Sequence, residues 1–294
     1  MIGIDWGTSS FRAFRIARDG TIRDRRSALR GILTVQDARF GDTLREEIGP
    51  WLALGEDQVL LSGMIGSRQG WKEAPYLPCP AAPADIAAAL TDIDFEWARV
   101  KLVPGLSCTD ANGVAEVMRG EEAQILGVPA LMSAGGLVCL PGTHSKWARV
   151  ARGRIEGFTT HMTGEVYAAL RGHTILGRTM RDGSAGGSAF EAGVRRSADP
   201  GGLLHHVFGV RSQTLVAALA ETDAGAYLSG ILIGHEIRAA MAGMDGAVVH
   251  VVGAAELTQL YASAIALCGG FAECHHGDAA ALGLSRIAAG AAWG

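Results

Sequence analysis

The 294-residue chain lacks several features that would assign it to particular classes of protein. No long run of Lys or Arg occurs, and the net charge is −4 with a pI near 6.1, which argues against a nucleic-acid-binding protein. The clearest uncharged apolar segment, residues 224–234, is too short to cross a bilayer. The five cysteines are odd in number without paired spacing, which is typical of free thiols in a reducing compartment. We therefore expect a cytoplasmic protein without a signal peptide or a membrane partner.

Hydrophobic residues make up 48% of the chain, enough for one large core or two of ordinary size. The first stretch is a short apolar run that ends in Asp5, Gly7, Thr8 and Ser9, after which alternation resumes from Phe11. This pattern predicts a strand, a tight turn and a second strand. Backbone N–H groups and hydroxyls in such a turn can bind phosphate, and the carboxylate can bind a metal ion. With 41 glycines in the chain, a structural hairpin is the simpler interpretation of this copy alone.

A second copy of the layout, at an offset of 135 positions, changes that interpretation. Gly142 and Thr143 correspond to Gly7 and Thr8, and His144 follows them between two predicted strands. A period this long indicates two similar domains that open on the same hairpin. We expect an α/β chain with boundaries at 1–131 and 132–294, whose last helix packs back toward the first domain, and whose two hairpins together hold a polyphosphate.

Between the hairpins, two segments carry candidate functional side chains. The predicted strand at residues 58–61 runs into a glycine-rich loop with Arg68, Gln69 and Trp71, which could bind a carboxylate, hydroxyls and a sugar ring respectively. The same segment is equally compatible with an ordered surface loop in which Trp71 packs inward. Residues 110–127 predict one helix, with Glu121 near the centre of its apolar stripe and Glu122 to the side. A buried carboxylate is a candidate general base, or else a partner of a structural arginine.

Later in the chain, a predicted buried strand at residues 247–252 breaks into Gly253 and Ala254 before a helix. Small residues at such a turn let a flat base lie along the backbone, or simply allow close packing of helix and strand. Thr163 is expected to cap the helix that follows the second hairpin.

Taken in order, these elements resemble the acetate and sugar kinase, heat-shock-70 and actin superfamily. Within it the chain resembles the 2-dehydro-3-deoxygalactonokinase family over nearly its whole length. The motifs that carry this resemblance are Asp5-Trp6-Gly7-Thr8, Gly63-Met64-Ile65-Gly66-Ser67-Arg68-Gln69-Gly70-Trp71, Arg119-Gly120-Glu121-Glu122, Leu140-Pro141-Gly142-Thr143-His144-Ser145-Lys146-Trp147, Met162-Thr163-Gly164-Glu165 and Tyr227-Leu228-Ser229-Gly230.

The resemblance implies two ribonuclease-H-like domains of duplicated topology with a nucleotide cleft between them. It implies phosphorylation of 2-dehydro-3-deoxy-D-galactonate at its terminal hydroxyl by ATP and Mg²⁺, giving the 6-phosphate in galactonate breakdown. Asp5 would hold Mg²⁺, Glu121 (alternatively Glu122) would accept the hydroxyl proton, and Gly253 with Ala254 would flank the adenosine. The phosphate-binding residues implied are Gly7, Thr8, Ser9, Gly142, Thr143 and His144.

Arg68 is the candidate for the substrate carboxylate on chemical grounds, with Gln69 and Trp71 as further substrate contacts. Three alternatives remain: an exopolyphosphatase-type phosphohydrolase, which would need a long basic channel, a kinase of another 2-keto-3-deoxy sugar acid, and a non-catalytic nucleotide sensor. A homodimer is compatible with the sequence, and no nucleic-acid partner is expected.

Overall fold

The computed structural model describes residues 1–275 and 278–293, and these group into two compact units. The first contains residues 1–135, 148–158 and 278–293, and the second contains residues 136–147 and 159–275. Within the described residues, no helix is both long enough and apolar enough to span a membrane.

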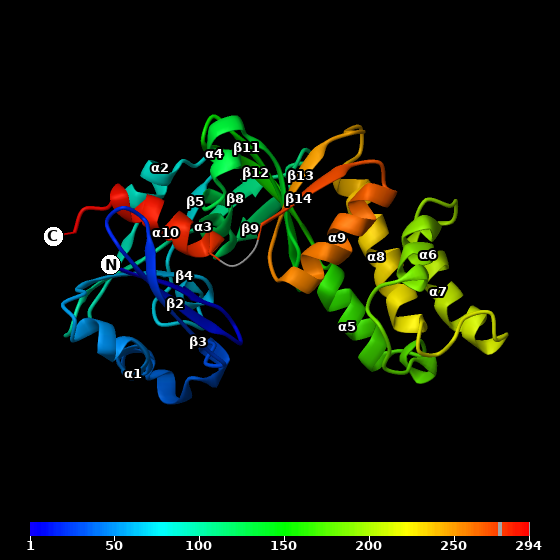
Figure 1. Cartoon of the computed structure of the whole chain (residues 1–294), viewed down its shortest axis with the longest axis horizontal. Helices are drawn as coiled ribbons and strands as arrows, with labels where there is room; N and C mark the ends of the chain where they lie inside the picture. Colours follow the sequence, from blue (N-terminus) through cyan, green and yellow to red (C-terminus); the bar gives the residue numbers. More distant parts are fainter. Residues whose placement is uncertain (276–277, 294) are drawn as a thin grey trace. The chain divides into compact units, whose positions relative to one another are not determined.

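The first unit is built on a six-stranded sheet in the order β3-β2-β1-β4-β7-β6. Its strands β2, β3 and β4 are labelled in Figure 1. The strand β1 pairs antiparallel with β2 and parallel with β4, so the carboxyl ends of β1 and β4 lie at the same edge of the sheet. A smaller sheet has the order β5-β8-β9. The strands are β1 (Ile2–Trp6), β2 (Phe11–Ile16), β3 (Ile22–Ala28), β4 (Gln58–Ser62), β5 (Tyr76–Pro78), β6 (Thr91–Ile93), β7 (Arg99–Leu102), β8 (Gly105–Thr109) and β9 (Ala115–Met118).

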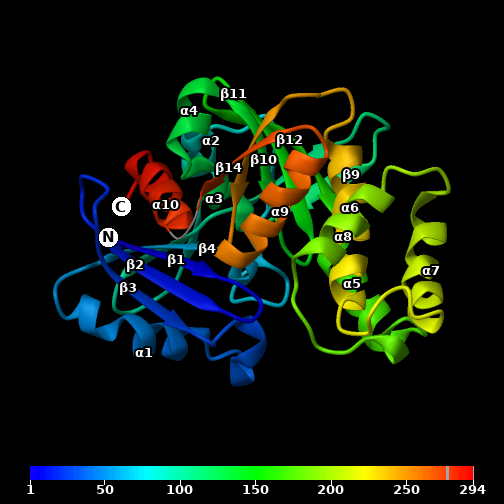
Figure 2. The same ribbon diagram turned by 45° about the vertical axis from the view of Figure 1, so that its right-hand side comes forward.

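Helices pack on this sheet through apolar side chains that alternate along its strands. Phe40, Leu44 and Ile48 of α1 join the core formed by β1, β4 and β7, while Ala280 and Ala281 of α10 pack with Phe14 and Ile16 of β2. Figure 2 shows α1 and α10 on opposite sides of the β1–β2 hairpin. The helices of this unit are α1 (Phe40–Leu52), α2 (Pro83–Ala88), α3 (Glu121–Leu126), α4 (Pro129–Ala134) and α10 (Ala279–Ala289), with short 3-10 turns at Ile32–Thr34, Gln36–Ala38 and Met64–Gly66.

A five-stranded sheet has the order β12-β11-β10-β13-β14, in which β10, β13 and β14 run parallel; residues 148–158, in its strands β11 and β12, are grouped with the first unit, and the rest of the sheet belongs to the second. The strands are β10 (Gly136–Leu140), β11 (Ser145–Ala151), β12 (Arg154–His161), β13 (Val248–Val252) and β14 (Phe271–His275). Helices α5, α6 and α7 all pack on α8, as Figure 2 shows. The helices are α5 (Thr163–His173), α6 (Ser188–Arg196), α7 (Gly202–Leu215), α8 (Ala224–Ala240) and α9 (Ala255–Leu267), with a 3-10 turn at Gly177–Thr179.

The single helix predicted at residues 110–127 is wrong. Asp110 accepts hydrogen bonds from the backbone of Asn112 and Val114 and so forms a turn, and β9 follows as an edge strand paired with β8. The helix α3 begins only at Glu121, after Gly120 with a φ of 105°. Val114 and Val117 are exposed, so they form no buried stripe. Branched side chains and the Asp turn favour a hairpin here, which a helical periodicity alone does not reveal.

Candidate functional site

The turn of the first hairpin lies at the end of β1 and exposes the backbone and hydroxyls of Thr8 and Ser9. Two hydrogen bonds fix the backbone of this turn: the N–H groups of Ile32 and Leu33 donate to the carbonyls of Gly7 and Thr8. Only glycine fits at position 31, where a Cβ atom would lie 2.3 Å from the nitrogen of Ser9. The turn is therefore a preformed set of backbone and hydroxyl groups rather than a mobile tip.

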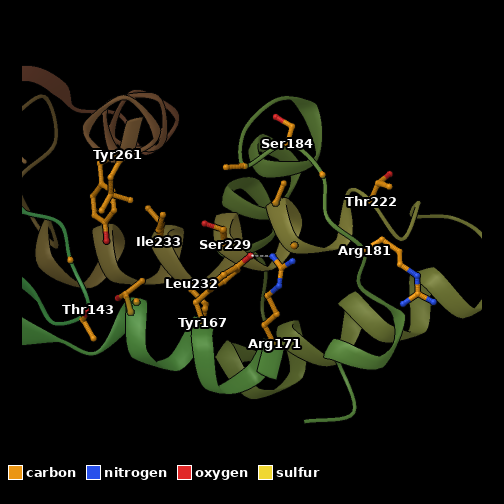
Figure 3. Close-up of a pocket in the computed structure, with 18 residues that line it drawn as sticks. Thr143, Tyr167, Arg171, Arg181, Ser184, Thr222, Ser229, Leu232, Ile233 and Tyr261 are labelled. Atoms are coloured by element: carbon orange, nitrogen blue, oxygen red, sulfur yellow. Dashed lines mark hydrogen bonds between the residues drawn. The ribbon is translucent and has the colours of Figure 1, made fainter. Parts of the chain in front are cut away.

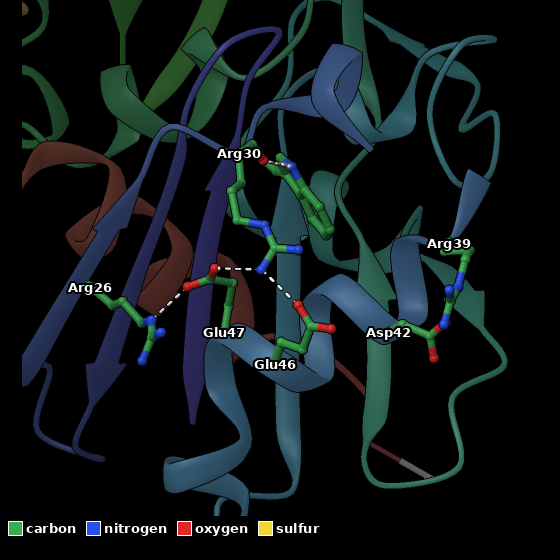
Figure 4. A network of polar contacts seen from close by, with 7 residues as sticks. Arg26, Arg30, Arg39, Asp42, Glu46 and Glu47 are labelled. Atoms are coloured by element: carbon green, nitrogen blue, oxygen red, sulfur yellow. Dashed lines mark hydrogen bonds and ion pairs between the residues drawn. The ribbon is translucent and has the colours of Figure 1, made fainter. Parts of the chain in front are cut away.

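Charged side chains brace the segment that supports this turn. The buried Glu47 of α1 pairs with both Arg26 and Arg30, and Arg30 also reaches Glu46 (Figure 4). The carbonyl of Arg30 accepts a hydrogen bond of 2.8 Å from the indole of Trp6 in β1. The network fixes the chain just before Gly31, and so fixes the backbone that packs on the turn.

Asp5 is buried at the end of β1, and its Oδ2 is paired with Arg12, the residue opposite it on β2. Its Oδ1 faces Gly63, where a Cβ atom would lie 3.3 Å from that oxygen. Gly63 has a φ of 99° and passes under the carbonyl of Trp6, so a side chain at this position would both strain the backbone and crowd the carboxylate. The site therefore presents one carboxylate oxygen beside a glycine.

Two adjacent glutamates at the start of α3 differ sharply in burial. Glu122 is fully buried; it accepts hydrogen bonds from the hydroxyl of Ser62 at 2.9 Å and from the backbone of Gly120 at 2.7 Å. Burial, with repulsion from Glu121, raises the pKa of Glu122 to about 8. Glu121 is only half-buried and accepts a hydrogen bond from the backbone of Arg119. The sequence prediction that Glu121 is the buried member of the pair is wrong, because that prediction assumed a continuous helix.

The glycine-rich loop after β4 lies in the same unit as these carboxylates. Arg68 is 86% exposed and is ion-paired with Glu73, and Gln69 is exposed. Trp71 is half-buried against the core and contacts Phe95 edge to face at 6.0 Å. Arg68 and Gln69 thus point to solvent, whereas the Trp71 ring packs inward.

The turn of the second hairpin packs on the first turn of α5. The Thr143 carbonyl accepts from the backbone of Glu165 at 3.0 Å, and the His144 ring pairs with the Glu165 side chain. A Cβ atom at Gly164 would lie 2.5 Å from the carbonyl oxygen of Gly142, so glycine is required for this approach. Thr163 is the first residue of α5 and makes no capping hydrogen bond, so the predicted capping role is wrong. The N-terminus of an 11-residue helix thus lies beside the exposed Thr143.

A cavity of about 510 Å³ begins at this turn and extends between helices of the second unit (Figure 3). Thr143 and Thr163 line it near the turn, and Arg171 lines it farther along, with its guanidinium donating to the hydroxyl of Tyr167 at 3.1 Å. Sequence reasoning assigned Thr163 a different role and missed the other helical residues, because their spacing resembles that of any amphipathic helix. The remaining lining residues are Gly142, Gly164, Arg181, Gly183, Ser184, Ala185, Thr222, Gly225, Ala226, Ser229, Leu232, Ile233, Leu257 and Tyr261.

The predicted turn at Gly253 and Ala254 joins β13 to α9. The backbone nitrogen of Gly253 donates to the carbonyl of His275, and the Gly253 backbone passes near Pro141, which precedes the second turn. Leu257 and Tyr261 of the following helix line the cavity, although Gly253 and Ala254 are not among its lining residues in the described chain. The turn thus lies beside the second hairpin.

Solved structures define the class of this fold. The activator of 2-hydroxyisocaproyl-CoA dehydratase from Clostridium difficile, solved with bound ADPNP, superimposes with a TM-score of 0.51 at 13% identity, covering 99% of this chain and 95% of that one. The chain has a mixed α/β fold with three sheets, and this activator shares that fold. At this identity the likeness concerns the fold alone.

The family is shown by closer relatives. The family model for 2-keto-3-deoxy-galactonokinase matches residues 5–287. A Rhizobium meliloti protein assigned as a 2-dehydro-3-deoxygalactonokinase is 42% identical over 89% of this chain and 87% of its own, and the Escherichia coli 2-dehydro-3-deoxygalactonokinase is 33% identical over 95% and 94%. A Sinorhizobium meliloti crystal structure with the same assignment gives a TM-score of 0.87 at 40% identity, covering 98% and 97%. The chain belongs to the 2-keto-3-deoxy-galactonokinase family, which confirms the resemblance noted in its motifs.

Proposed function

We propose that this carbohydrate kinase transfers the γ-phosphoryl group of ATP to the terminal hydroxyl of 2-dehydro-3-deoxy-D-galactonate, giving the 6-phosphate used in galactonate catabolism. The observation that carries the proposal is the family match over residues 5–287. Structural support comes from the cavity that begins at a threonine-bearing turn beside a helix N-terminus, a favourable arrangement for phosphate. The two arginines of this cavity, Arg171 and Arg181, are paired with Asp182 and Glu221. Their charges are therefore neutralised, which disfavours an exopolyphosphatase, since that enzyme would need a basic channel.

The nucleotide is proposed to place its phosphates at Gly142, Thr143 and His144 and its nucleoside in the 510 Å³ cavity. Thr143 offers a hydroxyl, and the N–H groups at the start of α5 point toward the same end. The Gly253-Ala254 turn is proposed to flank the adenosine, with Leu257 and Tyr261 supplying side-chain contacts from the cavity wall.

The first turn is proposed to bind phosphate through Gly7, Thr8 and Ser9 and the metal through Asp5. Mg²⁺ keeps several waters and takes few protein carboxylates alongside substrate phosphates, so a single aspartate with one oxygen facing a glycine fits it. Bound Mg²⁺ would neutralise phosphate charge during transfer. Arg12, which holds the other oxygen of Asp5, keeps this carboxylate oriented.

Glu121 is proposed as the general base, and the reason is exposure. A base must reach the substrate hydroxyl, and Glu121 is partly exposed whereas Glu122 is enclosed and uses both its oxygens within the protein. Glu121 accepts the hydroxyl proton as that oxygen bonds to the γ-phosphorus and the bond to the β-phosphate oxygen breaks, releasing ADP. Glu122 holds the start of α3 against β4.

The two sheets support the finer assignment of architecture. Each has three strands that are consecutive in sequence, followed by two later strands. The first strand pairs in parallel with one later strand, which pairs in parallel with the other, giving the orders β3-β2-β1-β4-β7 and β12-β11-β10-β13-β14. We propose that they are duplicated ribonuclease-H-like domains with sequence boundaries near 1–131 and 132–294. The cleft between them stays a prediction.

A coupled ADP-release assay tests the activity. With ATP and Mg²⁺, we expect release that depends on the keto-acid sugar, faster with the galactonate than with the gluconate derivative. Glu121→Gln should lower kcat by about 10²- to 10⁴-fold with little change in the KM for ATP. ADP release that ignores the sugar would favour a hydrolase, ATP binding without release would favour a sensor, and normal turnover by Glu121→Gln would eliminate Glu121 as the base.

A further inference from the structure

Arg119 has buried donors and forms no ion pair with an acid among the residues that the structure describes. It lies between β9 and α3, two residues before Glu121. Its Nη2 donates to the carbonyl of Ala74 at 2.7 Å, and its guanidinium carbon lies 4.5 Å from the centre of the Tyr76 ring. Its Nε and Nη1 are buried and have no hydrogen-bond partner among the described residues. Burying a guanidinium with two unsatisfied donors is costly, so a function that uses them is expected.

A second unsatisfied polar group lies in the loop that packs on this guanidinium. A Cβ atom at Gly66 would come within 2.9 Å of Nη1 of Arg119, so the loop backbone lies directly against the charge. The next residue is Ser67, whose hydroxyl is also buried and has no partner in the described chain. Three donor groups therefore gather where the glycine-rich loop meets the Arg119 motif, and no ion pair of Arg119 occurs within residues 1–275 and 278–293.

The other arginine of this region is already satisfied. Arg68 is 86% exposed and forms an ion pair of 2.9 Å with Glu73. An exposed pair of this kind contributes little, and water screens its charge, so Arg68 is a weak anchor for an anion. A buried guanidinium N–H donates to a carboxylate in an environment of low dielectric constant, where such a charge-assisted hydrogen bond is strong.

We propose that Arg119 and Ser67 form the subsite that binds the substrate carboxylate, replacing Arg68 in that role. The inference rests on the proposed function, since it requires a sugar acid as substrate. Nη1 of Arg119 donates to one carboxylate oxygen, and the Ser67 hydroxyl donates a second hydrogen bond. Because the Arg119 backbone N–H donates to Glu121, the guanidinium lies no farther from the base than the reach of one arginine side chain. One segment thus holds both ends of a six-carbon acid.

Entry of the carboxylate requires the loop to shift, because the donor atoms have no contact with solvent. The loop backbone carries glycines at positions 63, 66 and 70, and its closing hydrogen bonds run from Trp71 to Ile65 and from Ala74 to Gly66. The sugar acid should therefore change hydrogen exchange at Ser67, whereas the matching primary amide should do so far less.

The decisive experiment crosses the protein variant with the substrate charge. Steady-state kinetics are measured for wild type, Arg119→Gln and Arg68→Gln, each with the sugar acid and with its primary amide. Loss of a charge-assisted hydrogen bond should make Arg119→Gln lose about 10- to 100-fold in kcat/KM for the acid and about threefold or less for the amide, mainly through KM. The KM for ATP should stay unchanged, and Arg68→Gln should behave as wild type.

Several results would overturn the proposal. An equal loss for acid and amide in Arg119→Gln would show a role in packing only, and an acid-selective loss in Arg68→Gln would return the carboxylate to Arg68. If Arg119→Gln fails to fold by circular dichroism, Ser67→Ala provides the test, with an acid-selective loss of about fivefold expected and no loss refuting the subsite. Wild type without any sugar-dependent ADP release would instead refute the proposed function.

Discussion

Replacing Glu122 with glutamine should change the pH dependence of stability in a way that the structure allows us to calculate. The buried carboxyl has a pKa of about 8 in the folded protein, against an ordinary value of 4.5. Below pH 4.5 it is protonated in both states and contributes no penalty. Between pH 4.5 and about 8 the unfolded chain releases a proton that the folded protein retains, so the free energy of unfolding falls as the pH rises.

The magnitude follows from the difference between the two pKa values. Each pKa unit corresponds to about 1.4 kcal/mol, so this one group should remove up to about 5 kcal/mol of stability across that pH range. A glutamine at this position would keep the local geometry, because its carbonyl can accept from Gly120 and its amide can donate to Ser62. The amide does not titrate, however, so its contribution is independent of pH. Glu122→Gln should therefore be the more stable protein near pH 8 and nearly equal to wild type near pH 4.5.

The assay is urea unfolding of both proteins at several pH values across this range, with the difference in free energy plotted against pH. Groups that do not interact with residue 122 cancel in that difference. Glu121→Gln is the matched control: removing the neighbouring charge should lower the pKa of Glu122 and so reduce the slope without abolishing it. If wild type and Glu122→Gln give parallel curves, Glu122 is not buried as the structure shows.

Two further predictions concern the second unit. Gly164→Ala places a Cβ atom 2.5 Å from the carbonyl of Gly142 and should lower kcat/KM for ATP by about 10- to 100-fold. The control is Gly172→Ala on the same helix, whose Cβ atom would meet nothing within 4 Å and which should leave kcat/KM unchanged. Equal effects of the two substitutions would refute the phosphate role of this turn. Tyr261→Phe removes a hydrogen bond of 2.7 Å to the buried Glu236 and should lower the free energy of unfolding by about 1–3 kcal/mol in urea; an unchanged value would mean that water replaces the hydroxyl.

Local pattern was sufficient to predict the hairpins. The alternation around residues 2–16 and 137–150, with glycine and hydroxyl residues between, predicted β1–β2 and β10–β11, and both occur. A strand before Ser62 and another before Gly253 were also confirmed. These elements depend on neighbours in sequence, since side-chain alternation and turn residues act over a few positions. Helix ends are less well determined by local pattern: Gly49 and Pro50 are typical of a helix end, but α1 continues past them to Leu52, and Trp51 is buried in the core.

The sequence by itself determined the family, the two hairpins and the set of acidic, basic and hydroxyl residues available for chemistry. Tertiary structure decided which of them are buried and which are paired. Glu122 rather than Glu121 is enclosed because α3 starts at Gly120 and its second residue faces Ser62 of β4. Arg68 is paired while Arg119 is not, because Glu73 lies beside the first and the loop backbone at Gly66 covers the second. Burial and pairing arise from contacts between residues far apart in the chain, and no local pattern contains them.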